Sequence, residues 1–267
     1  MSGDVVLYEV GSGIAEVTLN RPQALNAWTP ELGSAYFDRL EEADADPDAR
    51  AIVVTGAGRG FCAGADFDYL QDVYEGRRPT GDDPRPQSLP RSLGKPVIAA
   101  INGPCAGLGF VMAMMCDLRF AAAGAKMTTA FARRGLIAEY GLSWILGRVA
   151  GPSRALDLLL SGRTFLAEEA ERIGVVDRLA DPGRALDDAR AYATELIENS
   201  SPASMATIKR QVYDDLEREL EEAGRVAKEY MADSFTRPDF REGVESFVER
   251  RTPNFPPLAS AARANPS

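Results

Sequence analysis

Two short runs of apolar residues constrain the fold of this chain most strongly. Residues 51–55 (AIVVT) and Val97–Ile101 (VIAAI) carry no charged side chain, and glycines follow each run. A run this short and this apolar is typical of a strand that is covered on both faces. The sequence therefore predicts an α/β protein in which buried strands alternate with helices.

The rest of the chain adds further predicted elements. Alternating apolar residues on either side of residues 11–13 predict a β-hairpin over residues 5–10 and Ile14–Leu19. Thr29, followed by Pro30, predicts the start of a helix that residues 46–47 end. The sequence also predicts a loop or lid at residues 72–91, a helix at Leu108–Met115 and a strand at Leu118–Ala122. Beyond residue 150 it predicts helices, including an amphipathic stretch at 202–235. We expect a core over residues 1–200 and a C-terminal helical region over 201–267.

Histidine is absent from all 267 residues. Ser–His–Asp systems and histidine-ligated metal sites are therefore excluded, and no metal is expected. Acid–base chemistry has to rest on carboxylates, Lys, Tyr, Cys or backbone amides. With 30 basic and 40 acidic side chains the formal charge is −10, which argues against binding nucleic acid.

Cysteine usage and hydropathy indicate the compartment. Cys62, Cys105 and Cys116 form no C-x-x-C motif, as expected in a reducing cytoplasm. The first ten residues do not resemble a signal peptide. The longest apolar stretch, residues 105–115, is too short to span a membrane. We expect a cytoplasmic protein without a membrane partner.

Two glycine-rich segments follow the buried runs, at residues 61–66 (FCAGAD) and 101–109 (INGPCAGLG). Small residues let a ligand approach the backbone, and the first amides of a helix have no partner within the helix. One N–H group from each segment can converge on a carbonyl oxygen and stabilise an enolate. Either segment alone is more often only a packing turn. The nearby residues 55–60 (TGAGRG) lack the third glycine of a dinucleotide-binding motif and are interpreted as a turn.

Residues 51–66 and 97–117 resemble the two hallmark segments of the enoyl-CoA hydratase/isomerase superfamily. Weaker similarities extend the resemblance over nearly the whole chain, at residues 19–26, 167–177, 201–202 and 241–251. The resemblance implies an α/β crotonase (ClpP-like) fold, with a repeated ββα core and a C-terminal helical oligomerisation region. It also implies an acyl-CoA substrate, no other cofactor, and a homotrimer or a dimer of trimers.

The resemblance also implies the residues of the site. The family's oxyanion hole corresponds to the backbone N–H groups of Ala63 and Leu108, the latter beside Gly107. Coenzyme A is expected to lie along Ala24, Leu25, Ala63, Ala65, Asp66 and Phe67. Asp66 has a structural alternative, as the cap of the helix that follows it.

Two carboxylates of the family pattern are missing. Hydratases of this family activate one water with two glutamates, and the matching positions here are Val111 and Phe131. Neither side chain can transfer a proton, so both are expected only to line the substrate pocket. The usual hydratase apparatus is therefore absent.

Glu139 is the remaining candidate acid/base. Its position matches an aspartate that shuttles a proton in dienoyl-CoA isomerases and is a nucleophile in the 4-chlorobenzoyl-CoA dehalogenase. Burial near Val111, Phe131, Tyr140 and Trp144 is expected to raise its pKa. Tyr140 lines the pocket as a candidate hydrogen-bond partner, although a tyrosine after a turn more often only packs. The alternative is a first-turn glutamate that interacts with the helix dipole.

Three functions remain open at this point. The favoured one is double-bond isomerisation, because a single carboxylate can remove a proton and return it elsewhere. The second is hydration of an enoyl-CoA through Glu139 and water. The third, of another class, is a non-catalytic acyl-CoA-binding protein.

Overall fold

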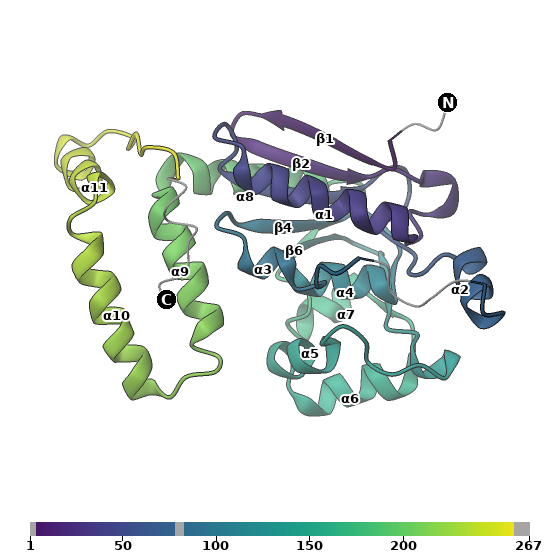
Figure 1. Ribbon diagram of the computed structural model, residues 1–267. Coiled ribbons are helices and arrows are strands. Elements are labelled where there is room, and N and C mark those ends of the chain that lie inside the picture. Colours follow the sequence, from purple (N-terminus) through teal and green to yellow (C-terminus); the bar gives the residue numbers. More distant parts are fainter. Residues whose placement is uncertain (1–3, 78–82, 259–267) are drawn as a thin grey trace.

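The computed structural model describes residues 4–77 and 83–258 and has a six-stranded sheet at its centre (Figure 1). The strand order is β1-β2-β3-β4-β6-β9. The first two strands pair antiparallel, which confirms the predicted hairpin, and each later pair is parallel. The strands are β1 (Val6–Gly11), β2 (Ile14–Leu19), β3 (Ala51–Gly56), β4 (Val97–Ile101), β6 (Leu118–Ala122) and β9 (Arg178–Ala180).

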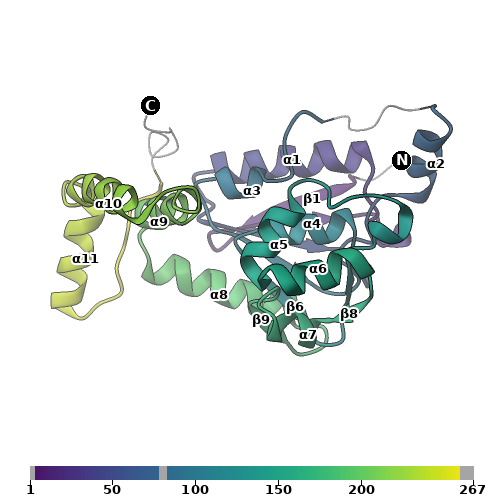
Figure 2. The ribbon, with the colours of Figure 1, turned by 90° about the horizontal axis from the view of Figure 1, so that it is seen from below.

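Helices cover both faces of this sheet. On β3, Ile52 and Val54 belong to the larger core, which includes side chains of α1 and α4. Ala51 and Val53 point to the other face and pack with α8. Figures 1 and 2 show α1 and α8 on opposite sides of the sheet. The prediction of a strand covered on both faces is confirmed.

The helices begin largely where their sequence signals predict. The N–H of Leu32 donates to Thr29 Oγ1 at 3.2 Å, and Pro30 is the first residue of α1. The helices of eight residues or more are α1 (Pro30–Ala45), α2 (Phe67–Tyr74), α4 (Leu108–Met115), α5 (Leu142–Ala150), α6 (Pro152–Ser161), α8 (Ala185–Asn199), α9 (Pro202–Asp214), α10 (Leu220–Ser234) and α11 (Pro238–Glu249). The shorter ones are α3 (Leu89–Ser92), α7 (Ala167–Arg172) and the 3-10 turns η1 (Pro22–Ala24) and η2 (Ala132–Arg134).

The glycine-rich segment before α4 contributes a strand to a small second sheet. Its order is β5-β7-β8, formed by β5 (Cys105–Ala106), β7 (Lys126–Thr128) and β8 (Phe165–Leu166). Strand β5 ends directly before Gly107, and α4 begins at the next residue. Every residue of α4 is buried, which confirms the predicted apolar helix.

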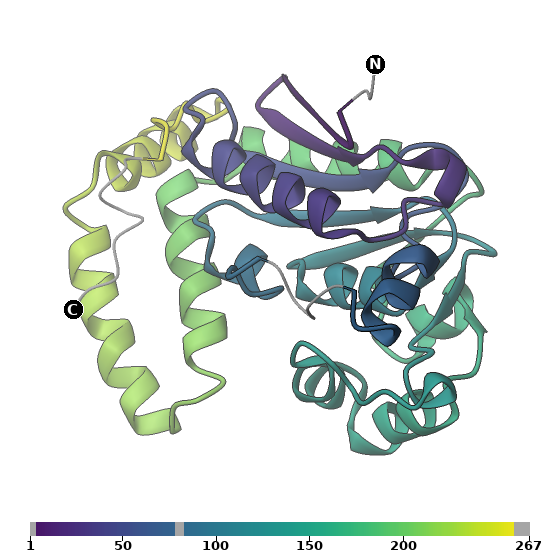
Figure 3. The same cartoon turned by 45° about the vertical axis from the view of Figure 1, so that its right-hand side comes forward.

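The C-terminal helices stand apart from the sheet (Figure 3). The amphipathic stretch predicted at 202–235 forms two helices, α9 and α10, and no residue of α10 is buried. Among the described residues, none of the helices is both long enough and apolar enough to cross a membrane. The loop predicted at 72–91 includes the last turn of α2 and the start of α3, and its residues 78–82 lie outside the described part.

A glycine on α4 sets how closely this helix approaches the segment after β3. A Cβ atom on Gly109 would lie 2.3 Å from the carbonyl oxygen of Cys62, so Gly109→Ala should destabilise the fold by about 1–3 kcal/mol. Gly147 on α5 has no atom within 4 Å of its Cβ position, and Gly147→Ala should stabilise by about 0.5–1 kcal/mol. Urea unfolding of both variants tests the difference, and equal effects would contradict it.

Candidate active site

The two glycine-rich segments meet beyond the carboxyl ends of β3 and β4. These strands are parallel neighbours, so the chain leaves both at the same edge of the sheet. There the N–H of Phe61 donates to the carbonyl of Pro104 at 3.1 Å, and the N–H of Ala106 donates to the carbonyl of Cys62 at 2.9 Å. The segments predicted to share one site are thus bonded to each other through their backbones.

The closest approach between the segments is at two glycines. Gly64 and Gly107 both have positive φ, 94° and 50°, and a Cβ atom on Gly64 would lie 2.9 Å from the carbonyl oxygen of Ala106. The next residues, Ala65 and Leu108, have N–H groups that donate no hydrogen bond within the described chain. Leu108 opens α4, where the helix dipole adds positive potential. Two free donors thus lie on neighbouring backbones, as an oxyanion hole requires.

The prediction that Ala63 supplies the first of these donors is wrong. Its N–H is already bonded to the carbonyl oxygen of Leu25 at 3.0 Å. A backbone amide carries a single hydrogen, so this bond leaves nothing to offer a ligand. The free donor on this segment is Ala65, two residues later.

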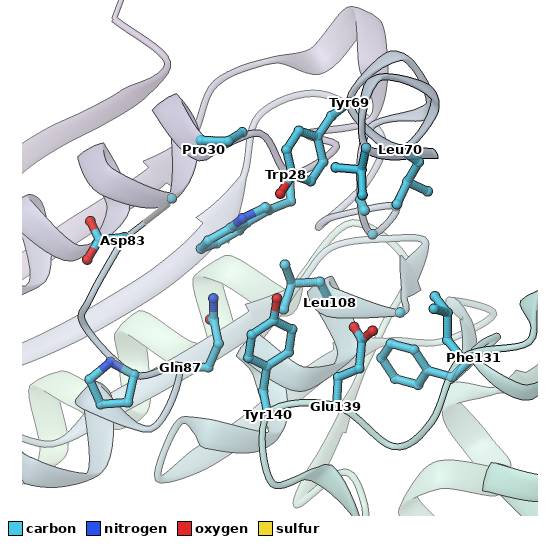
Figure 4. Close-up of a pocket in the computed structure, with 18 of the residues that line it drawn as sticks. Trp28, Pro30, Tyr69, Leu70, Asp83, Gln87, Leu108, Phe131, Glu139 and Tyr140 are labelled. Atoms are coloured by element: carbon cyan, nitrogen blue, oxygen red, sulfur yellow. The ribbon is translucent and has the colours of Figure 1, made fainter. Parts of the chain in front are cut away.

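Beside these amides lies a cavity of about 450 Å³ (Figure 4). Helix α2 contributes Tyr69 and Leu70 to one wall, and Figure 4 shows Phe131 and Glu139 across from them. The sequence-predicted residues that line the cavity are Ala63, Ala65, Gly107, Leu108, Phe131, Glu139 and Tyr140. Sequence reasoning missed Trp28, Tyr69 and Gln87. No pattern in the sequence around Trp28 marks it, because its place at the cavity depends on a backbone pairing with Ala65, which is distant in sequence.

Glu139 occupies the cavity wall between η2 and α5. Its carboxylate makes no hydrogen bond or ion pair to any residue that the structure describes, and burial raises its pKa, as expected from the sequence. Helix α5 begins at Leu142 with Gly141 as its N-cap. Glu139 therefore precedes the first turn, and the interpretation as a first-turn glutamate is wrong. Its carbonyl oxygen accepts the N–H of Leu142 at 3.0 Å.

Tyr140 lines the same cavity but is half exposed. No hydrogen bond joins its hydroxyl to Glu139 in the structure, so of the two interpretations of Tyr140 the one as a hydrogen-bond partner is wrong. Burial raises the pKa of Tyr140, and the nearby charge of Glu139 adds to the effect. Its φ of +53° is unusual outside glycine and, followed by Gly141 at +76°, turns the chain sharply into α5.

Comparisons with known proteins agree with this geometry. The family model described as "Enoyl-CoA hydratase/isomerase" matches residues 9–257. The chain belongs to this family. A probable enoyl-CoA hydratase of Mycobacterium tuberculosis is 35% identical over 255 residues, covering 96% of this chain and 99% of that protein. The 1,2-epoxyphenylacetyl-CoA isomerase of Escherichia coli is 34% identical over 263 residues, covering 94% and 98%.

Solved structures show the same relationship. An enoyl-CoA hydratase from Mycobacterium marinum is 51% identical, with a TM-score of 0.70 over 81% of this chain and 100% of that chain. An enoyl-CoA hydratase from Mycobacterium tuberculosis is 29% identical, with a TM-score of 0.88 over 95% and 99%. The protein thus has the crotonase fold and is an acyl-CoA enzyme of the hydratase/isomerase class.

Within this enoyl-CoA hydratase/isomerase family member, Val111 does not reach the cavity. Its side chain is fully buried in the larger hydrophobic core and does not line the cavity, so the expectation that it lines the pocket is wrong. Phe131 does line the cavity and is 5% exposed. Neither position offers a group that could activate water.

The residues expected along coenzyme A lie mostly outside the cavity. Asp66 caps α2 by accepting the N–H of Asp68 at 3.1 Å and forms an ion pair with Arg21 at 3.0 Å, so its structural role is confirmed. Phe67 is 77% exposed. Ala24, Leu25, Asp66 and Phe67 do not line the cavity, and their contact with coenzyme A stays a prediction.

Proposed function

We propose that this protein shifts a double bond in an acyl-CoA thioester, with Glu139 as its single acid/base. Among the described residues, Glu139 is the cavity-lining carboxylate that has no hydrogen-bond or ion-pair partner. The other cavity-lining carboxylate, Asp83, is paired with Arg85 at 2.7 Å, and this partner lowers its pKa to about 2. Glu139, whose pKa burial raises, is therefore the carboxylate suited to take up and release a proton.

The reaction follows from the positions of three groups. The thioester oxygen accepts hydrogen bonds from the N–H groups of Ala65 and Leu108. When Glu139 removes a proton from the α- or γ-carbon, the electron pair moves toward the thioester oxygen, where the two N–H groups stabilise the enolate. Glu139 then returns the proton to the other end of the allylic system. The proton is conserved, and neither water nor a cofactor is consumed.

Hydration is the second candidate for the same site. It would require a base for the water and an acid for the α-carbon, yet Val111 is buried in the core and Phe131 is apolar. Glu139 would have to serve both steps with the help of a second water. Isomerisation needs one carboxylate only, which is why we rank it first. Passive binding of acyl-CoA gives Glu139 no role.

Replacing Glu139 by glutamine tests its role. Glu139→Gln should lower turnover of a 3-enoyl-CoA by about 10²–10⁴-fold, because the amide cannot exchange the proton. The assay covers 2-enoyl-, 3-enoyl- and 3,5-dienoyl-CoA, with Glu31→Gln on the exposed start of α1 as the matched control. Rapid hydration of 2-enoyl-CoA would contradict isomerisation, and full turnover by Glu139→Gln would remove Glu139 from either mechanism.

The same assay has a pH signature. Burial raises the pKa of Glu139, and the base must be ionised to act. Activity should therefore rise with pH through this raised pKa, above the ordinary range of a glutamate, and fall as the pH drops below it. The residual activity of Glu139→Gln should not show this rise with pH.

The second oxyanion donor can be removed without breaking α4. Leu108 is the first residue of the helix, where proline is tolerated because its missing N–H has no helical partner. Leu108→Pro should lower kcat by about 10²–10³-fold. Leu108→Ala, which keeps the N–H, accounts for the loss of the side chain. Similar activity in the two variants would show that this amide is not used.

We also propose that the reaction takes place in the cytoplasm, with the CoA thioester as its only small molecule. The three cysteines are free and buried, which supports a reducing compartment. The protein would act as a homotrimer or a dimer of trimers. The C-terminal helices support this, because Leu220, Phe247 and Val248 are 88%, 85% and 73% exposed, and large exposed apolar side chains mark contact surfaces.

Light scattering after size exclusion tests the assembly. The mass should correspond to three or six chains of 28.8 kDa. Replacing Phe247 and Val248 by serine should shift it toward the monomer, because the variant has lost apolar contact area. Leu160→Ser on α6, which is also highly exposed, is the control and should leave the mass unchanged. A monomeric wild-type protein would overturn the proposal.

A further inference from the structure

A second cavity, of about 370 Å³, adjoins the candidate active site. It shares Pro86, Gln87 and Tyr140 with the first cavity. Figure 4 shows the side chains of Gln87 and Tyr140 next to each other on the wall that faces Trp28. These two side chains therefore lie at the boundary between the two cavities.

Gln87 is a polar side chain without a partner at this boundary. It is 7% exposed, and its Oε1 atom is buried with no hydrogen bond to the described residues. Its amide nitrogen points into the first cavity in Figure 4 and has no hydrogen-bond partner among the described residues. Buried amides are almost always hydrogen-bonded, so an unpaired one beside two cavities indicates a ligand group.

Arg91 places a positive charge in the second cavity. Its guanidinium lies between the rings of Trp144 and Tyr213, at 4.6 and 4.1 Å from their centroids. This stacking fixes the plane of the group and leaves its N–H edge available. Arg91 forms no ion pair with the described residues. The nearby carboxylate of Asp117 is already paired with Lys209 at 2.7 Å.

We infer that the second cavity binds a carboxylate at the far end of the acyl chain, so that the preferred substrates are CoA monothioesters of dicarboxylic acids. Arg91 presents N–H donors and a positive charge in this cavity, which suit an anion that only accepts hydrogen bonds, and the amide of Gln87 lies at its boundary with the first cavity. The apolar side chains of Met115 and Trp144 cover the methylene groups before it. The inference rests on the proposed function, since it assumes a thioester held at Leu108.

Binding of unreactive saturated thioesters tests this subsite apart from catalysis. Calorimetry compares adipyl-CoA with hexanoyl-CoA, which share a chain length and differ in the terminal carboxylate. The wild-type protein should bind adipyl-CoA about tenfold more tightly or better, the size expected for charge-assisted hydrogen bonds. Glutaryl- and suberyl-CoA then give the length of chain that reaches Arg91.

Two variants and one control assign the preference to residues. Arg91→Met should bring the ratio of the two affinities close to one and leave the affinity for hexanoyl-CoA unchanged. Gln87→Met should also lower this ratio, which is the readout for that variant because Gln87 lines the first cavity as well. Arg148→Met is the matched control, because Arg148 stacks on the same Trp144 at 3.8 Å but lies outside the cavity. It should keep the preference. Melting temperatures confirm that each variant is folded.

Each other outcome has its own meaning. Equal wild-type affinity for the two thioesters would overturn the inference, as would an equal effect of Arg91→Met and Arg148→Met. Weaker binding of both thioesters by Arg91→Met would show that Arg91 binds a phosphate of coenzyme A instead, which also overturns it. If the wild-type protein bound neither thioester, the proposed function itself would fail. Binding without the preference would refute the subsite alone.

Discussion

The structure depends on one close contact between two backbones. Gly64 and Gly107 approach so closely that a side chain on Gly64 would meet the carbonyl of Ala106, and both adopt positive φ. Gly109 allows α4 an equally close approach to Cys62. These contacts hold two N–H groups, one at the start of a helix, that have no partner among the residues the structure describes. Glycine makes this possible because it lacks the atom that would fill the space.

A second constraint concerns where charge is placed. Within the described chain, Asp83 in the cavity wall and Asp66 at the start of α2 are paired with Arg85 and Arg21. Glu139 is left unpaired and partly desolvated, which raises its pKa. An ionised carboxylate in that position is less stable than it would be in water. Glu139 therefore takes up a proton more readily than an exposed glutamate does. The site therefore sacrifices some stability at one side chain for reactivity.

Much of the fold could be predicted from local patterns. The apolar runs at β3 and β4, the hairpin and the capped start of α1 follow from residues adjacent in sequence. The site was predicted in part. The sequence predicts the two segments and Glu139, but it also predicts Ala63 as the donor and Val111 as a lining residue. Both errors concern the direction in which a group points. The sequence gives the position of an amide or side chain, but contacts with distant residues decide its direction, as the hydrogen bond from Ala63 to Leu25, 38 residues earlier, does.

The sequence by itself determined the chemistry that was available. With no histidine, chemistry had to rest on carboxylates and backbone amides, and the family resemblance pointed to Glu139, because it implies glutamates where this chain has Val111 and Phe131. Only the tertiary structure decided which groups share a cavity. Trp28, Tyr69, Gln87 and Arg91 come from separate elements, and no local pattern marks them. Their proximity arises from packing between distant segments, because burial and pairing depend on the whole surface that each side chain meets rather than on its neighbours in the chain.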